Sequence, residues 1–158
     1  MICSREPRPL DESGVRALTK LERHLVQDVL AERIAKHDDG GFNSTEVRDI
    51  LRRFPAAEVA FLFPQPISLP KSRLRTRMGG TVEELAGAPN PVFYVELSKV
   101  QMVRVGANLG LVLQYSSWPT GKRPAGIAWM WGIWGEFCAV PNRTGGWDAY
   151  PLGGVLGS

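Results

Sequence analysis

The sequence is poor in the residues that small proteins use for covalent or metal-held frameworks. Its 158 residues include two cysteines, Cys3 and Cys138, and two histidines, His24 and His37. One cysteine pair makes no disulfide framework, and the sequence has neither a CxxC motif nor a Cys/His cluster that would hold zinc. We therefore expect free thiols, no metal site, no cofactor and a cytoplasmic location.

The sequence also lacks a long apolar run. Its longest uncharged apolar stretch, residues 125–135, is far shorter than the roughly 20 residues of a transmembrane helix. Glu6, Asp11 and Glu12 stand where a secretory signal would be apolar. These absences predict a soluble protein with no membrane partner.

The charge is nearly balanced, with 19 Lys and Arg against 16 Asp and Glu, a net charge of +3. Nucleic-acid binding depends more on a local stripe of cations than on the total. One segment, KSRLRTR, alternates cations with other residues, so an extended backbone would carry four cations on one side: Lys71, Arg73, Arg75 and Arg77. This row of four cations predicts contact with an anion or a nucleic acid, but no aromatic residue lies between the cations to stack on bases. The alternative is a solvated connector whose charges keep the protein soluble.

The composition is that of a folded domain, because 44% of the residues are hydrophobic and 22% are charged. The length fits one domain over residues 1–158, and we expect the ends, residues 1–10 and 152–158, to be flexible.

The first third of the chain has helical patterns. Apolar residues recur every three or four positions over residues 12–35, which predicts an amphipathic helix. A second helix is predicted over residues 43–54, because Asn43 and Glu46 form a capping box and Pro55 ends the helix. Residues 58–63 are short and apolar, and they fit either a strand or a buried helical turn.

Beyond Pro91 the patterns are those of strands. Runs rich in β-branched and aromatic residues cover residues 92–97, 100–105 and 110–115, with breaks at Ser98-Lys99 and at residues 106–108. A loop is predicted over residues 116–124, followed by one or two strands within residues 127–140. The order of elements predicts an α+β fold, in which two N-terminal helices pack on a C-terminal antiparallel sheet of about four to six strands.

No residue qualifies as catalytic. His24, Asp28 and Glu32 lie four apart, which fits an acid/base pair or a partial metal site as well as an ordinary solvated helix flank. Cys138 lies in an apolar run without a nucleophile motif, and no serine lies in a GxSxG elbow. A winged-helix fold would need a recognition helix over residues 56–63, and that segment is nearly uncharged.

Tryptophans concentrate in one segment, where Trp129, Trp131 and Trp134 fall within six residues. With Glu136 they can wall a pocket for an aromatic ligand or an organic cation. In a regular strand Trp134 and Glu136 share one face and the other two rings share the opposite face, so all four meet only if a bulge intervenes. The alternative is that the rings fill the core or a dimer face.

These patterns favour a non-catalytic binding or regulatory module that acts through surface contacts, as a homodimer or with a protein or small-molecule partner. The alternatives are a small-molecule binding protein or enzyme with a Trp-lined pocket, and a protein that contacts nucleic acid through residues 71–77.

Overall fold

The computed structural model describes residues 6–31, 54–123, 125, 133–152 and 156–157 of the chain. Within these ranges two helices and seven strands follow one another: α1 (Glu12–Leu30), β1 (Glu58–Leu62), β2 (Arg75–Met78), α3 (Val82–Ala86), β3 (Pro91–Val105), β4 (Asn108–Gly121), β5 (Ile133–Pro141), β6 (Trp147–Pro151) and β7 (Leu156–Gly157). The α+β class predicted from the sequence is confirmed.

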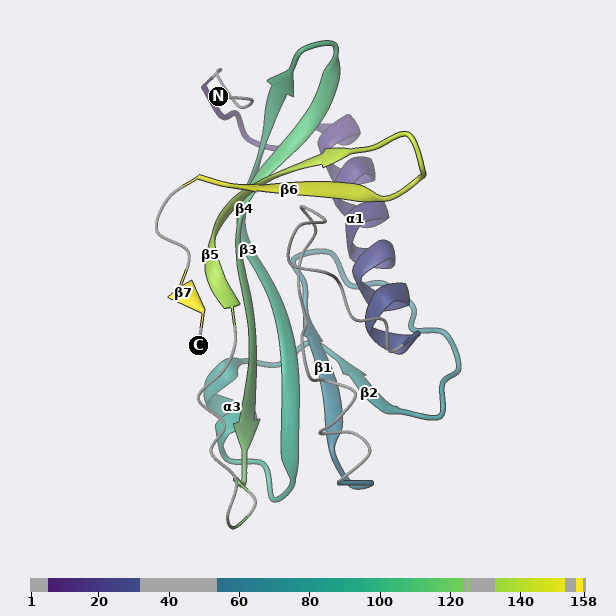
Figure 1. Cartoon of the computed structure of the whole chain (residues 1–158), viewed down its shortest axis with the longest axis vertical. Helices are drawn as coiled ribbons and strands as arrows, with labels where there is room; N and C mark the ends of the chain where they lie inside the picture. The colour runs from purple at the N-terminus through teal and green to yellow at the C-terminus, as the bar shows by residue number, and fades with distance from the viewer. Residues whose placement is uncertain (1–5, 32–53, 124, 126–132, 153–155, 158) are drawn as a thin grey trace.

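The first helix begins where its periodicity predicts it, and it ends at Leu30, before the predicted end at residue 35. The Asp11 carboxylate caps α1 by accepting a hydrogen bond from the Gly14 N–H at 2.9 Å. The apolar stripe of the helix is buried against one face of the sheet, through Leu18, Leu21, Leu25, Val26 and Val29. Figure 1 shows α1 alongside the sheet.

The strands form a mixed sheet in the order β2-β1-β3-β4-β5-β6, and the short β7 also pairs with β5. The expected all-antiparallel sheet is therefore wrong, because β1 pairs in parallel with both β2 and β3. Parallel neighbours need crossover connections. Residues 63–74 connect β1 to β2, and residues 79–90, which include α3, connect β2 to β3. Each connection brings the chain back to the end of the sheet at which the preceding strand began.

The hairpin of β3 and β4 is longer than the sequence patterns indicate. The predicted break at Ser98-Lys99 is a β-bulge within one continuous strand, with Lys99 at a φ of +52°. The predicted loop over residues 116–124 is strand as far as Gly121. A bulge uses the same exposed polar residues as a turn, which is why the pattern is misleading there.

The predicted pair of N-terminal helices is not the arrangement of the described residues. The second predicted helix spans residues 43–54, and residues 43–53 lie outside the described residues. The other described helix, α3, lies between β2 and β3 and packs through Leu85 on the sheet face opposite α1. Residues 58–62 form the strand β1, which rules out a winged-helix recognition helix there.

The core lies mainly between α1 and the sheet. Alternate residues of the strands face this layer, including Phe61, Phe93, Leu113 and Phe137. The opposite face carries two smaller apolar clusters. One surrounds Leu85 of α3 and the other contains Val103, Cys138 and Val140.

Two contacts concern the cysteines and the N-terminal segment. Cys138 is fully buried and disulfide-bonded, so the expected free thiol is wrong at this position. The other cysteine of the sequence, Cys3, lies outside the described residues. In the segment before α1, Arg8 exchanges two backbone hydrogen bonds with Met102 of β3, at 2.9 and 2.8 Å.

None of the described helices combines the length and apolar character needed to cross a bilayer.

Candidate functional site

A polar strip crosses the outer face of the sheet, the face opposite α1. Strand register places its side chains in two rows across β3, β4 and β5. One row is Ser98–Gln114–Glu136 and the other is Glu96–Ser116–Trp134. Opposed residues in neighbouring strands have Cβ atoms about 5 Å apart. The six side chains therefore form one continuous patch between the two apolar clusters of this face.

This patch lines a hollow of about 280 Å³, which we call the outer cleft. Ligand sites typically begin near about 300 Å³, so the hollow suits a small molecule. Trp134 is 44% exposed there and is the exposed large hydrophobic side chain among the described residues. An exposed indole ring beside polar groups offers a flat apolar surface to a ligand.

The outer cleft is electronegative. Glu96 and Glu136 both line it, and none of its described lining residues is Lys, Arg or His. Burial raises the pKa of Glu96, and the nearby Glu83 raises it further. The second effect shows that the carboxylates of β3 and α3 repel one another. A positively charged ligand would relieve that repulsion.

The short helix α3 places Glu83 near this strip. Thr81 caps the helix by accepting a hydrogen bond from the Glu84 N–H at 3.2 Å. Burial and the charge of Glu96 raise the pKa of Tyr94 to about 12, so this phenol remains protonated at neutral pH.

Two of the four residues predicted for a Trp-lined site line the outer cleft together, Trp134 and Glu136. Trp129 and Trp131 lie outside the described residues. The remaining tryptophans support apolar clusters instead, since Trp147 is buried in the main core and Trp118 packs against the cluster around Leu85. The tryptophans are thus divided between core and site.

The predicted row of four cations is divided between the two faces of the sheet. Lys71 lies in the connector after β1 and lines a groove beside α1. Arg75 and Arg77 are in β2, opposite Glu58 and Ala60 and therefore on the α3 side, and Arg77 lies 3.8 Å from the Glu58 carboxylate. Arg73 precedes β2 and is exposed. Lys71 and Arg73 precede β2, and only Arg75 and Arg77 lie in a strand, so the four cations do not lie along one extended segment.

His24 and Asp28 form the i,i+4 pair that their spacing allows, with His24 Nε2 3.1 Å from Asp28 Oδ2. Glu32 lies outside the described residues. The described parts of the chain contain no group of three or more His, Cys, Asp or Glu residues able to hold a metal ion.

Sequence reasoning missed the four other side chains of the polar strip that line the outer cleft: Glu96, Ser98, Gln114 and Ser116. Period-two alternation places Glu96 and Ser98 on one face of β3, but only the register joins them to Trp134. It also missed Glu22, a carboxyl group buried inside α1's apolar stripe, which a search for charges in that stripe would have found.

No protein-family model, curated protein or solved structure matches this chain.

Proposed function

We propose that the protein is a non-catalytic binding protein that takes up a small organic cation in the outer cleft. One observation carries the proposal: the exposed Trp134 ring shares a hollow with Glu96 and Glu136, and the described lining holds no positive side chain.

An organic ammonium group matches this lining better than other ligands. The face of an indole attracts a cation, by about 0.5–2 kcal/mol depending on how far the cation is desolvated. Carboxylates repel anions, which argues against phosphate-bearing ligands. A metal ion would need clustered ligands, which the described residues do not provide.

Binding is favoured over catalysis because the lining lacks an activated nucleophile. Ser98 and Ser116 carry the hydroxyl groups of the outer cleft, and no described lining residue is a histidine or lysine that would serve as their base. The serines and Gln114 instead offer hydrogen bonds that would orient a bound ligand.

The test is to titrate the protein with choline and with its neutral isostere 3,3-dimethylbutan-1-ol and to measure the binding of each by isothermal titration calorimetry. We expect choline to bind and the alcohol to bind at least tenfold more weakly, because only the charged group gains from the ring and the carboxylates. Trp134→Leu and Glu136→Gln should each weaken choline binding about three- to tenfold.

Glu12→Gln is the matched control, because it removes an exposed carboxylate from α1 on the other side of the sheet. It should leave choline binding unchanged. Equal affinity for choline and the alcohol, or equal losses in Glu136→Gln and Glu12→Gln, would contradict the proposal.

The raised pKa of Glu96 gives the binding a pH dependence. Cation binding requires the carboxylate form, so affinity should fall as the pH falls through the raised pKa of Glu96. In Glu96→Gln this part of the pH dependence should disappear. The calorimetric titration repeated between pH 4 and pH 8 checks it.

The homodimer and the cytoplasmic location expected from the sequence stay predictions. Light scattering across micromolar concentrations tests the dimer, and a strict monomer would contradict it.

A further inference from the structure

A second hollow lies on the α1 side of the molecule. It runs between α1 and the turns of the β3–β4 and β5–β6 hairpins, and it has two parts of about 560 and 660 Å³. The two parts share four lining residues, His24, Gln27, Gly145 and Gly146, so they form one continuous groove. We call it the helix groove.

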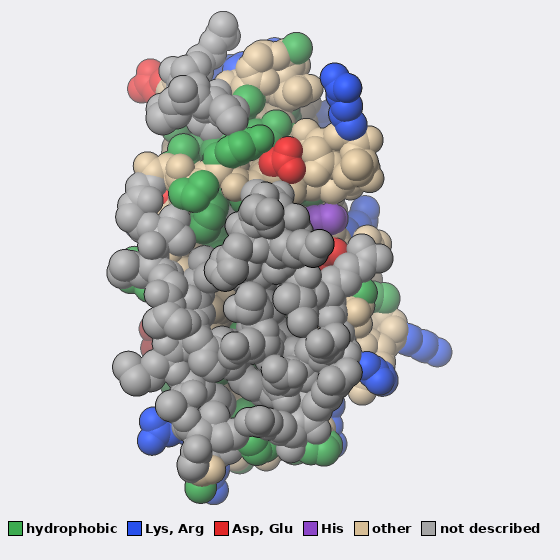
Figure 2. All heavy atoms as spheres, in the orientation of Figure 1, with side chains coloured by type: hydrophobic (Ala, Val, Ile, Leu, Met, Phe, Trp, Pro, Cys, Tyr) green, Lys and Arg blue, Asp and Glu red, His purple; other side chains and the backbone are tan. Residues whose placement is uncertain are grey.

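The α1 wall of the helix groove is a stripe of cations. Arg16, Lys20 and Arg23 follow one another at helical spacing along this wall, and Lys71 extends the series from the connector after β1. From Arg16 to Arg23 the stripe is about 10 Å long along the helix axis. Figure 2 shows Lys and Arg side chains along the edge of the molecule where Figure 1 places α1 and β2.

Most of this positive charge is available to a ligand. Lys20 and Arg23 are exposed and form no ion pair with the residues that the structure describes. Arg16 lies 3.3 Å from Glu12, but both side chains of that pair are mostly exposed, which makes it weak. The carboxylate that lines the groove, Asp28, is paired with His24.

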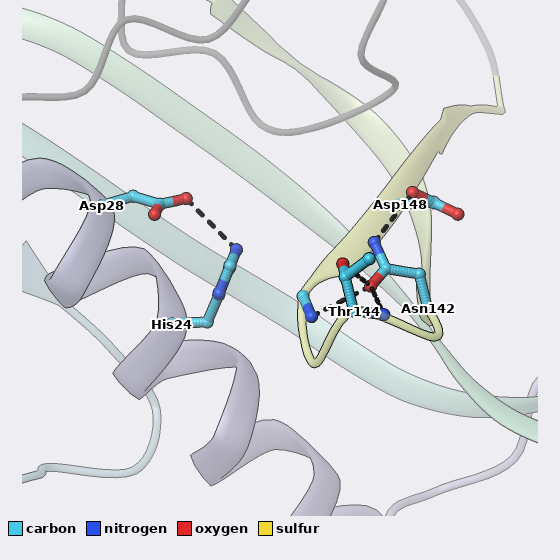
Figure 3. Close-up of polar contacts among 6 residues, drawn as sticks. His24, Asp28, Asn142, Thr144 and Asp148 are labelled. Carbon is cyan, nitrogen blue, oxygen red and sulfur yellow. Dashed lines mark hydrogen bonds and ion pairs between the residues drawn. The ribbon is translucent and has the colours of Figure 1, made fainter.

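The hairpin wall is polar and rigid. The Asn142 side chain accepts hydrogen bonds from the N–H groups of Thr144 and Gly146 and from the Thr144 hydroxyl, and it donates to Asp148. Figure 3 shows this network on the hairpin and the His24–Asp28 pair on the helix opposite. A Cβ atom on Gly146 would lie 3.4 Å from His24 Cε1, so the His24 ring lies directly against the turn where the two parts of the groove meet.

We infer that the helix groove binds single-stranded nucleic acid, with the α1 stripe contacting consecutive phosphates. The charges are spread along the groove at intervals of about one helical turn, which suits a chain of phosphates better than one compact anion. The exposed Asn108 on the opposite wall offers its side-chain amide to a base.

The experiment is fluorescence anisotropy of a labelled 12-nucleotide oligo(dT) at salt concentrations from 25 to 300 mM. We expect salt-sensitive binding by the full chain. The double variant Lys20→Gln/Arg23→Gln should weaken binding about tenfold or more and should lower the slope of log K against log salt by about 1.4, which is about 0.7 for each phosphate contact removed.

Lys122→Gln/Arg123→Gln is the matched control. It removes the same charge from two exposed residues that follow β4 and do not line the helix groove. It should change the affinity less than twofold, and Trp134→Leu in the outer cleft should leave it unchanged. Unchanged melting temperatures will confirm that the variants fold.

Three results would overturn the inference: no binding by the wild-type protein, equal losses in the groove and control variants, or equal competition by polyglutamate of the same length. The last would mean that the groove recognises acidic chains in general. Failure of the cation site leaves this test unaffected, because the two sites lie on opposite faces of the sheet.

Discussion

Glu22 is a carboxyl group fully buried in the apolar layer between α1 and the sheet. Its Oε2 accepts a hydrogen bond from the Gln65 N–H at 3.1 Å, and its Oε1 has no hydrogen-bond partner among the described residues. Burial raises its pKa from 4.5 to about 7, and the Gln65 hydrogen bond offsets part of this rise. The folded state therefore holds the Glu22 proton more tightly than the unfolded state does.

This difference predicts a pH-dependent stability. The contribution of Glu22 is fully present below about pH 4.5 and is lost as the pH rises to about 7, where the charged form has become costly to bury. The loss is about 3 kcal/mol at 1.36 kcal/mol per pKa unit. Glu22→Gln should remove it, so the variant should gain stability relative to wild type between pH 5 and pH 8. Urea unfolding at both pH values measures this gain.

Glu12→Gln again serves as the control, since Glu12 is exposed at the start of the same helix. Its stability relative to wild type should be the same at pH 5 and pH 8. If Glu22→Gln also shows no relative gain, Glu22 is not the group that titrates.

Gly121 predicts a steric effect at the end of β4. Its φ is +76°, and a Cβ atom there would clash with the Asn90 carbonyl oxygen. Gly121→Ala should therefore lower the unfolding free energy by well over the roughly 1 kcal/mol that a left-handed φ alone costs a non-glycine residue. Gly145→Ala is the matched control, because its φ is +81° and its Cβ would meet open space. Equal losses in thermal or urea unfolding would contradict the steric explanation.

At the scale of elements, the turn between β5 and β6 depends on one side chain. The Asn142 carboxamide makes four hydrogen bonds within residues 142–148, beside one backbone bond from the Asn142 N–H to the Gly146 carbonyl oxygen. Asn142→Ala should lower the unfolding free energy by about 1–3 kcal/mol. Arg143→Ala, in the same turn and exposed, should have little effect. Urea unfolding of both variants checks this, and similar losses would show that the network contributes little.

The elements differ in how well their sequence patterns predict them. The helix α1 depends on contacts three and four residues apart and on its own cap, and its period-3.6 stripe predicts it correctly. The bulge at Lys99 is read as a turn because both expose polar residues. The parallel partners of β1 cannot be predicted from its apolar sequence, since every residue from Val59 to Leu62 is buried and no alternation marks one face.

At the scale of the whole molecule, the disulfide at Cys138 predicts sensitivity to reductant. A covalent link in a long chain restricts the unfolded state, and removing one costs typically 2–5 kcal/mol. Dithiothreitol, added during unfolding so that the buried sulfur is reached, should lower the melting temperature by several degrees. Calorimetry with and without reductant measures the shift. An unchanged melting temperature would show that the bond adds no stability.

The amino-acid sequence by itself determined the α+β class, the first helix and the strand parity that joins Trp134 to Glu136, because each depends on residues close together in the chain. The tertiary structure alone decided the mixed sheet, the meeting of Glu96 with Trp134 and the division of the basic segment between two faces. These arise from strand register and crossover connections, which bring together residues tens of positions apart and leave no periodic trace in the sequence.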